Sequence, residues 1–277
     1  MSMSRLSLLW LVCFLLPVST VIPFSADAGP LGEPFKDPVI RLFNGKNLDG
    51  WYTFLRESGK NNDPKKVFTI NKGVLRISGE EWGCITTNEE YDNYHLIVEY
   101  KWGKETHGSR LTKARDGGVL IHSKGKDGGY SGTWMHSLEC QLIEGGTGDI
   151  IVVGNGTPDF AVTSTVRKGA PNNSAYYDAN GTPETFTAGR INWYGRDPEW
   201  KDVIGFRGKN DLEKKLGKWN KLEIHAIGDD FKIFLNGKLV NHGTRVKPSS
   251  GRIQVQSEAA EMFFRRIDLI PMGQKGK

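Results

Sequence analysis

Carboxylate, amide and imidazole side chains alternate with apolar ones along two neighbouring segments of the chain. In SLECQL, residues 137–142, every second side chain is polar, including Glu139 and Gln141. A β-strand sends alternate side chains to opposite faces, so this carboxylate and this amide share one face. In DGGVLIHS, residues 116–123, the same count places His122 on the face opposite the β-branched residues. If the two polar faces meet, Glu139 and His122 form a titratable pair.

Glu139 and His122 are therefore the candidate catalytic residues, and also the candidate ligands of one divalent metal ion. A carboxylate can serve as a general base, and an imidazole can donate a hydrogen bond, shuttle a proton or bind a metal. The sequence leaves two alternatives open. Glu139 could be a solvated strand residue paired with a cation, and His122 could be a structural histidine.

The elements that would position these side chains are short strands, rich in β-branched and aromatic residues and separated by Gly, Asn and Asp. The predicted strand segments are VFTINKGVLRIS, HLIVEYKW, GGVLIHS, SLECQLIE, DIIVVG, KLEIHAIG, FKIFLNGKLV and GRIQVQS. Asn236-Gly237 is typical of a type I′ hairpin turn, and turns are also expected at 71–73 and 228–230. This pattern predicts an all-β, two-sheet sandwich of jelly-roll type, similar to concanavalin A-like and laminin G-like folds.

The first 28 residues have the pattern of a signal peptide. Arg5 precedes an apolar run at 6–16, and Ala26-Asp27-Ala28 is a small-x-small cleavage pattern. The run is short for a membrane span, and nothing later resembles one. We expect cleavage near Ala28, export to the periplasm or the extracellular space, and no stable membrane insertion.

Residues 29–277 are expected to form a single domain with a long loop insertion at about 155–218, which is rich in Gly, Pro, Asn and charge. A shorter insertion, residues 103–115, carries Arg110 and could form a rim near the polar strands. Of the two cysteines outside the leader, Cys140 lies on the apolar side of its strand, so a buried free thiol is favoured over a disulfide with Cys84.

The charge pattern argues against nucleic acid as a partner. The formal net charge is +5, but Lys and Arg are scattered among Asp and Glu, with no basic stripe interleaved with aromatic residues. The turn GGTG at 145–148 lacks the GK[ST] ending of a phosphate loop. The carboxylates that flank it, Glu144 and Asp149, are expected to cap the turn, with calcium binding as the alternative. No GxSxG or HExxH motif is present.

Seven segments in order resemble the 3-keto-disaccharide hydrolase family, whose fold is a concanavalin A-like jelly roll. They are LFNGKNLDGW, GCITTNEEYDNYHLIVEYKW, DGGVLIHS, SLECQLIEGGTGD, GKWNKLEI, LNGKLV and IQVQSEAAEMFFRRIDLIPM. The chain departs from the family pattern at Asp116-Gly117-Gly118, where Asn-Ser-Gly is common, and at His122, where Arg or His is found. Arg266 also stands where Asn is usual.

The resemblance implies cleavage of a glycoside whose sugar carries a ketone at C3. Such a ketone acidifies the C2 proton, so a base can remove it, the C1 substituent is expelled, and water adds back. The route needs a base, an electrophile for the C3 oxygen and an acid for the leaving oxygen. The resemblance also implies an upstream sugar 3-dehydrogenase, and its alternative is a non-catalytic carbohydrate-binding module of the same fold.

Further residues are expected to bind the sugar. Trp134 and His136 precede the 137–142 strand, and an indole can stack on the apolar face of a sugar ring. Gln256 and Glu258 alternate with apolar residues, and the family places their segment beside the groove. The candidate substrate-binding residues are Gln141, Trp134, His136, Gln256, Glu258 and Asp116.

Overall fold

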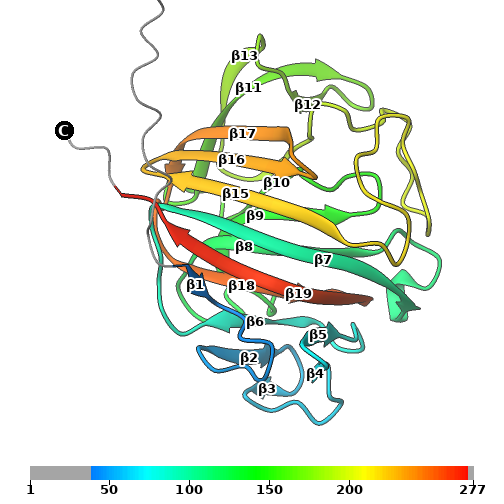
Figure 1. Cartoon of the computed structure of the whole chain (residues 1–277). Coiled ribbons are helices and arrows are strands. Elements are labelled where there is room, and N and C mark those ends of the chain that lie inside the picture. Colours follow the sequence, from blue (N-terminus) through cyan, green and yellow to red (C-terminus); the bar gives the residue numbers. More distant parts are fainter. Residues whose placement is uncertain (1–38, 274–277) are drawn as a thin grey trace, which may run out of the picture. The chain divides into compact units, whose positions relative to one another are not determined.

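Nineteen strands and one short 3-10 turn, η1 (Gly108–Arg110), make up the regular structure of residues 39–273, the range that this computed structural model describes. The strands form two antiparallel sheets (Figure 1), so the predicted all-β, two-sheet jelly-roll sandwich is confirmed. The predicted leader, residues 1–28, lies outside the described residues. Within them, no helix is long and apolar enough to cross a membrane.

The first sheet has eleven strands, and β15, β7 and β19 run side by side through it in Figure 1. Along the sheet the order is β12 (Ser174–Tyr177), β11 (Ala161–Gly169), β17 (Lys238–Lys247), β16 (Asp230–Leu235), β15 (Asn220–Ile227), β7 (Tyr94–Thr106), β19 (Ala260–Pro271), β5 (Val74–Ile77) and β4 (Phe68–Asn71). Two more strands pair outside this path, β1 (Ile40–Arg41) with β19 and β13 (Thr182–Phe186) with β11.

The second sheet has eight strands and carries the polar segments singled out above. Its order is β14 (Gly189–Ile191), β10 (Ile150–Val153), β9 (His136–Ile143), β8 (Asp116–Lys124), β18 (Arg252–Ser257), β6 (Gly83–Thr87), β2 (Trp51–Leu55) and β3 (Gly59–Lys60). The strands β9, β8 and β18 are therefore direct neighbours, although β18 lies more than a hundred residues further along the chain.

The two sheets enclose a large apolar core, to which the inward side chains of the second sheet contribute. Val119, Leu138 and Val255 are fully buried in it, together with inward residues of β7 such as Tyr94. Their alternation with polar side chains leaves the other face of β8, β9 and β18 free to carry a site. The face of the second sheet turned away from this core is called the outer face below.

The cysteines and the Asn236-Gly237 turn agree with their predictions. Cys140 lies in the main core, whereas Cys84 packs with residues of the outer face, and both are buried free thiols. Asn236 and Gly237 both have positive φ, 50° and 82°, as a type I′ turn requires.

The segment 155–218 is more regular than expected. Its first half contains four strands, β11 to β14, so the expectation of a continuous loop insertion is wrong there. The sequence AVTSTVRKG of β11 is mostly threonine, serine and charge beyond its first residues, which hides the apolar alternation of a strand. Residues 192–219, by contrast, contain no strand and supply one wall of the site described next.

Candidate functional site

Three adjacent strands present polar side chains on the outer face of the second sheet. Leu120 of β8 lies opposite Glu139 of β9, and Gly118 lies opposite Gln141. On the other side of β8, Gln254 of β18 lies opposite Leu120. Because directly opposed residues point to the same face, Glu139, Gln141 and the alternate glutamines of β18 share the outer face. The predicted placement of Glu139 with Gln141 is confirmed.

Three carboxylates converge at one end of this face. Asp116 begins β8, Glu139 lies in β9, and Glu258 directly follows β18. All three residues are buried, with 4%, 4% and 9% of their surface exposed. Buried carboxylates normally have cationic or hydrogen-bonding partners, so the partners of each indicate its state.

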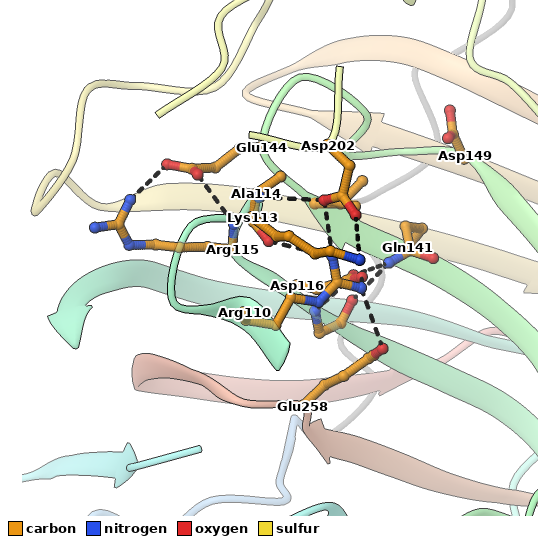
Figure 2. A network of polar contacts seen from close by, with 12 residues as sticks. Arg110, Lys113, Ala114, Arg115, Asp116, Gln141, Glu144, Asp149, Asp202 and Glu258 are labelled. Atoms are coloured by element: carbon orange, nitrogen blue, oxygen red, sulfur yellow. Dashed lines mark hydrogen bonds and ion pairs between the residues drawn. The ribbon is translucent and has the colours of Figure 1, made fainter. Parts of the chain in front are cut away.

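Arg110 joins two of these carboxylates, as Figure 2 shows. Its guanidinium pairs with Asp116 Oδ2, and the same Nη2 atom lies 3.6 Å from Glu258 Oε1. The other oxygen of Asp116 accepts hydrogen bonds from the Gln141 amide and from the Gly117 N–H. Asp116 is thus fully engaged, whereas Glu258 has only a long contact with the arginine.

The Glu139 carboxylate has no ion pair among the described residues, and the Arg190 guanidinium and the Gln256 amide only partly offset the effect of burial on its pKa. The Glu139 and Gln256 side chains lie over Gly118, where an added Cβ would overlap their Oε1 atoms. Gln256 is 1% exposed, and neither polar atom of its amide has a hydrogen-bond partner in the described part of the chain. The glycine therefore makes the space in which an unpaired carboxylate and an unpaired amide face each other.

Burial raises the pKa of all three carboxylates. Loss of solvent, followed by repulsion from Asp116, raises the pKa of Glu139 to about 8. Burial likewise raises the pKa of Asp116 to about 6, against the opposing effect of Arg110. The pKa of Glu258 lies well above the usual range because of burial and then repulsion from Asp116 and Glu139. The cluster therefore retains protons at neutral pH and can both donate and accept them.

Ion pairs and a hydrogen bond connect two loops at this end of the sheet, and this set of contacts of Asp202 is called the loop clamp below. Asp202, in the strand-free segment 192–219, pairs with Arg110 at 3.0 Å and accepts the N–H of Ala114 at 3.2 Å. Lys113 Nζ lies 3.5 Å from the second oxygen of Asp202. The expectation that the insertion with Arg110 rims the polar strands is confirmed by these contacts (Figure 2).

Asp149 organises a second cationic group beside Gln141. It is fully buried and accepts the N–H of Trp193 at 2.8 Å, while Arg190 and Arg196 both pair with its Oδ2. Arg190 also lies 3.4 Å from Gln141 Oε1. Arg190 is thus held near the carboxylate cluster by an anion outside that cluster.

Glu144, the other carboxylate beside the Gly-rich turn, is held by donors in the same manner. It accepts the N–H and a guanidinium bond of Arg115, at 3.0 and 2.8 Å, and the N–H of Gly205 at 2.8 Å. Its contacts fix the start of β8 and part of the 192–219 segment (Figure 2). Glu144 therefore connects these two segments through its hydrogen bonds.

His122 does not join Glu139, so the expectation that they share a face is wrong. An extra residue in β8 between Ile121 and Lys124 shifts the register with β9, and His122 adopts a positive φ of 54°. Such a bulge reverses the direction of a side chain. The His122 ring lies 5.8 Å from the core residue Tyr94, and its Nδ1 is 2.8 Å from the Pro248 carbonyl.

Trp134 and His136 also differ from the expectation of open sugar-binding residues. Trp134 is buried on the outer face, and its indole N–H donates to the Gly83 carbonyl at 3.2 Å. His136, at the opposite end of β9 from the carboxylates, packs 5.4 Å from Phe160, and its Nδ1 lies 3.3 Å from the Val153 carbonyl. Trp134 underlies the face next to Glu139, and His136 is not brought to the carboxylates.

The predicted metal ligands do not form a set. Glu139 and His122 point to opposite faces, and residues 39–273 contain no group of three or more His, Cys, Asp or Glu side chains suited to hold a metal ion. A divalent ion at this site stays a prediction of the sequence.

Arg190 and Asp202 were missed by sequence reasoning. Both lie in the segment 155–218 with no motif around them, and their partners are 49 residues away for Arg190 (Gln141) and 92 residues away for Asp202 (Arg110). Their only signal is a charge in a segment too long to be an ordinary loop.

The fold and this site define a two-sheet jelly-roll protein with a buried cluster of carboxylates on the outer face of one sheet. The model of the 3-keto-alpha-glucoside-1,2-lyase-like domain matches residues 38–270. The chain belongs to this 3-keto-disaccharide hydrolase family, as the seven segments predicted. No curated protein matches the chain in sequence.

Several solved structures are similar at low identity. A provisionally named glycosyl hydrolase from Parabacteroides distasonis is 19% identical, with 84% of this chain and 98% of that chain covered and a TM-score of 0.46. The carbohydrate-binding module CBM66 from Bacillus subtilis is 13% identical, covering 79% and 93%, with a TM-score of 0.40. A Bacillus licheniformis β-glucanase is 11% identical, with 84% of this chain and 97% of that chain covered and a TM-score of 0.41. Similarity at this level carries no information on the reaction.

Proposed function

We propose that the protein is an exported enzyme that cleaves glycosides whose sugar is oxidised to a ketone at C3. The observation that carries the proposal is Glu139, a buried carboxylate without an ion pair among the described residues, whose pKa is raised to about 8 beside Glu258, whose pKa burial raises well above the usual range. A base and an acid are thus available in one site at neutral pH. Membership of the family supports the keto-sugar as substrate.

The proposed reaction begins with proton transfer. Glu139 takes the proton from C2, which the C3 ketone acidifies, and the resulting enolate carries its charge on the C3 oxygen. Arg110 or Arg190 stabilises that charge, since each guanidinium lies at the edge of the carboxylate cluster. The electron pair then forms the C1–C2 double bond as the C1–O bond breaks, and protonated Glu258 donates a proton to the leaving oxygen.

Addition of water completes the reaction. The enone left by elimination takes a hydroxyl group at C1 and a proton at C2, so the net change is hydrolysis of the glycosidic bond. Glu139, protonated in the first step, supplies the C2 proton. The general acid recovers its proton from the water that adds.

The substrate tests the proposal directly. Purified protein is expected to release the leaving group from a 3-keto-glucoside and to leave the matching unoxidised glucoside intact. Equal cleavage of both would indicate direct glycoside hydrolysis by two of the carboxylates. Binding of either compound without turnover would favour the second candidate, a non-catalytic carbohydrate-binding module, for which the aromatic residues of the outer face are the supporting observation.

Glu139→Gln tests the base. We expect a loss of roughly 10² to 10⁴ in kcat, the usual contribution of a general base. The amide has the same shape, and removal of a buried carboxylate that is repelled by Asp116 should leave thermal unfolding unchanged or shift it upward. Glu223→Gln, a strand glutamate paired with His95 at 3.1 Å and Lys221 at 2.9 Å, is the matched control. Full turnover in Glu139→Gln would remove Glu139 from the mechanism.

Two parts of the proposal concern the surroundings of the enzyme. Export is proposed on the pattern of the first 28 residues. The substrate requires a preceding oxidation of a sugar hydroxyl at C3, so we propose that a sugar 3-dehydrogenase acts upstream. The proposed ligand of the protein is therefore an oxidised carbohydrate.

A further inference from the structure

An aromatic layer covers the outer face of the second sheet next to the carboxylates. Its buried members are Cys84, Leu120 and Trp134, and the partly buried Phe54, Trp82 and Tyr130 pack against them. Leu120 is the cross-strand neighbour of Glu139, so the layer begins one strand away from the proposed base. Neither the proposed proton transfers nor the loop clamp uses this layer.

Strand register places Trp82 beside Glu258. Gln256 lies opposite Cys84 and Ser257 opposite Gly83, which is the last pair of these two strands, and Glu258 and Trp82 are the residues that adjoin this pair in the chain. Trp82 also shares the outer face with Cys84, because the two are two residues apart in one extended segment. The Ser257 hydroxyl donates to the Glu81 carbonyl at 2.7 Å and so ties the ends of these strands together.

The surroundings hold Trp82 in a fixed position. The Trp82 carbonyl accepts the N–H of Arg56 at 2.8 Å. The neighbouring Glu81 carboxylate accepts the N–H groups of Glu57 and Ser58, at 3.0 and 2.8 Å, and the Ser58 hydroxyl at 2.9 Å. The turn after β2 is thus fastened to the residue that precedes Trp82, and the backbone that carries the indole is held by several hydrogen bonds.

The indole of Trp82 is one of the partly exposed side chains of the layer. Trp134, whose ring centroid lies 5.7 Å away, is buried beneath it, whereas Trp82 is only partly buried. The Arg56 guanidinium lies 5.0 Å from the Trp82 ring centroid and donates from Nε to Thr133 Oγ1 at 2.6 Å. The guanidinium thus lies over the Trp82 ring, so a ring that enters here would meet an aromatic surface flanked by a hydrogen-bond donor.

We propose that Trp82 binds the leaving group of the substrate, and that this group is a ring with an apolar face. The inference rests on the proposed function, because Glu258, next to Trp82, is the residue that would protonate the leaving oxygen. Indole surfaces bind the C–H face of a sugar and the face of an aromatic ring by the same contact. Arg56 donates hydrogen bonds to hydroxyl groups on the edge of that ring. Trp82 is thus a specificity-determining residue, and the proton transfers stay with the carboxylates.

Three substrates that differ only in the leaving group test this assignment. They are a 3-keto-disaccharide, an aryl 3-keto-glucoside and methyl 3-keto-glucoside. In Trp82→Ala, the ratio of kcat/KM for each ring-bearing substrate to that for the methyl glycoside should fall at least 10-fold, mainly through KM. Trp82→Phe should restore most of the ratio. A larger fall for the disaccharide than for the aryl compound identifies a sugar as the preferred ring, and the reverse identifies an aromatic group.

The control separates stacking from folding. Trp219→Ala removes another partly buried indole, which lies near Lys101 and Arg265, 4.9 and 4.6 Å from its ring centroid, and should leave the ratio unchanged. If Trp82→Ala lowers turnover of all three substrates equally, or leaves the ratio as it was, the assignment is wrong.

A binding measurement distinguishes failure of this inference from failure of the proposed function. The affinity of a disaccharide for Glu139→Gln, with and without Trp82→Ala, can be measured by calorimetry. If no 3-keto-glycoside is cleaved by the natural protein but Trp82→Ala weakens binding at least 10-fold, the proposed reaction is wrong and the binding site stands. Equal affinity in both backgrounds would overturn the binding site.

Discussion

At the scale of single residues, burial without a close cationic partner distinguishes Glu139 from an ordinary strand glutamate. Glu223 alternates with apolar neighbours in the same way, but it pairs with His95 and Lys221, and its pKa is lowered by these partners although burial opposes this. For Glu139, burial and repulsion from Asp116 outweigh the opposing effects of Arg190 and the Gln256 amide on its pKa. The alternation in the sequence is the same for both, so sequence could propose Glu139 but could not separate it from Glu223.

The raised pKa of Glu139 predicts how the rate depends on pH. A general base works in its deprotonated form, so kcat/KM for a 3-keto-glucoside should rise tenfold per pH unit below the apparent pKa of about 8. It should fall again at a higher pH, where Glu258 loses the proton that it donates to the leaving oxygen. The apparent value belongs to the coupled cluster with Asp116 and Glu258. Initial rates between pH 5.5 and 9.5 check this, and a profile that is already flat at pH 6 would contradict it.

His122 is expected to matter for acid stability and not for turnover. Burial lowers its pKa from 6.5 to about 4, so the folded state keeps it neutral while the unfolded state takes up a proton. This contribution is complete above pH 6.5 and is lost as the pH falls toward 4, by up to about 1.4 kcal/mol per pH unit. His122→Asn, which tolerates a positive φ, should flatten that slope in denaturant unfolding and keep most of kcat. Loss of kcat by 10²-fold or more in the folded variant would return His122 to the mechanism.

At the scale of elements, β8 supplies different surroundings on its two faces through adjacent glycines. A Cβ on Gly118 would overlap the Glu139 and Gln256 side chains on the outer face. A Cβ on Gly117 would lie 2.8 Å from the Met262 sulfur in the core. A methyl group added at position 118 therefore tests the site, and a methyl group added at position 117 tests the packing of the core.

Gly118→Ala and Gly117→Ala should accordingly separate turnover from stability. Gly118→Ala displaces the ends of two flexible side chains, so we expect kcat to fall at least 10-fold with a loss of stability below about 1.5 kcal/mol. Gly117→Ala overpacks the core, at a cost of about 1 to 3 kcal/mol, with kcat within about threefold of the natural protein. Thermal unfolding and initial rates on both variants check this. Equal turnover in the two would show that the space above Gly118 has no role.

The sequence predicts regular strands better than it predicts departures from them. The alternation in 137–142 is uninterrupted, and β9 places its side chains as expected. In β8 the alternation was extended one step too far, because the bulge at His122 depends on pairing with β9 and β18, which a single strand does not encode. The strand β11 was missed for the opposite reason, since its threonine-rich sequence conceals a strand that pairs on both edges.

At the scale of the whole molecule, the site is assembled from parts that are distant in the chain. The carboxylates of β8 and β9 could be brought together by local alternation, but Asp202 and Glu258 lie 63 residues or more from Glu139 in the chain. Their positions follow from strand order and loop docking, which depend on long-range packing. Alternation indicates that Gln256 and Glu258 share a polar face, and only the family resemblance places that face beside the groove. The arginines that balance the cluster had no comparable signal.

The number of free thiols in the mature protein depends both on removal of the leader and on where the remaining cysteines lie in the fold. Export with cleavage after Ala28 would remove Cys13 and leave a chain of residues 29–277 with Cys84 and Cys140. These two thiols lie in different clusters, one in the core between the sheets and one on the outer face, and both are fully buried. A disulfide needs Cβ atoms about 4 Å apart that point toward each other, which opposite faces of one sheet do not allow. We therefore expect the intact mass of the exported protein to match a chain that begins at Gly29. The folded protein should resist alkylation, and the protein unfolded without reductant should take up two alkyl groups. Uptake of three groups would show that the leader is retained, and uptake of none would show that the two thiols are paired.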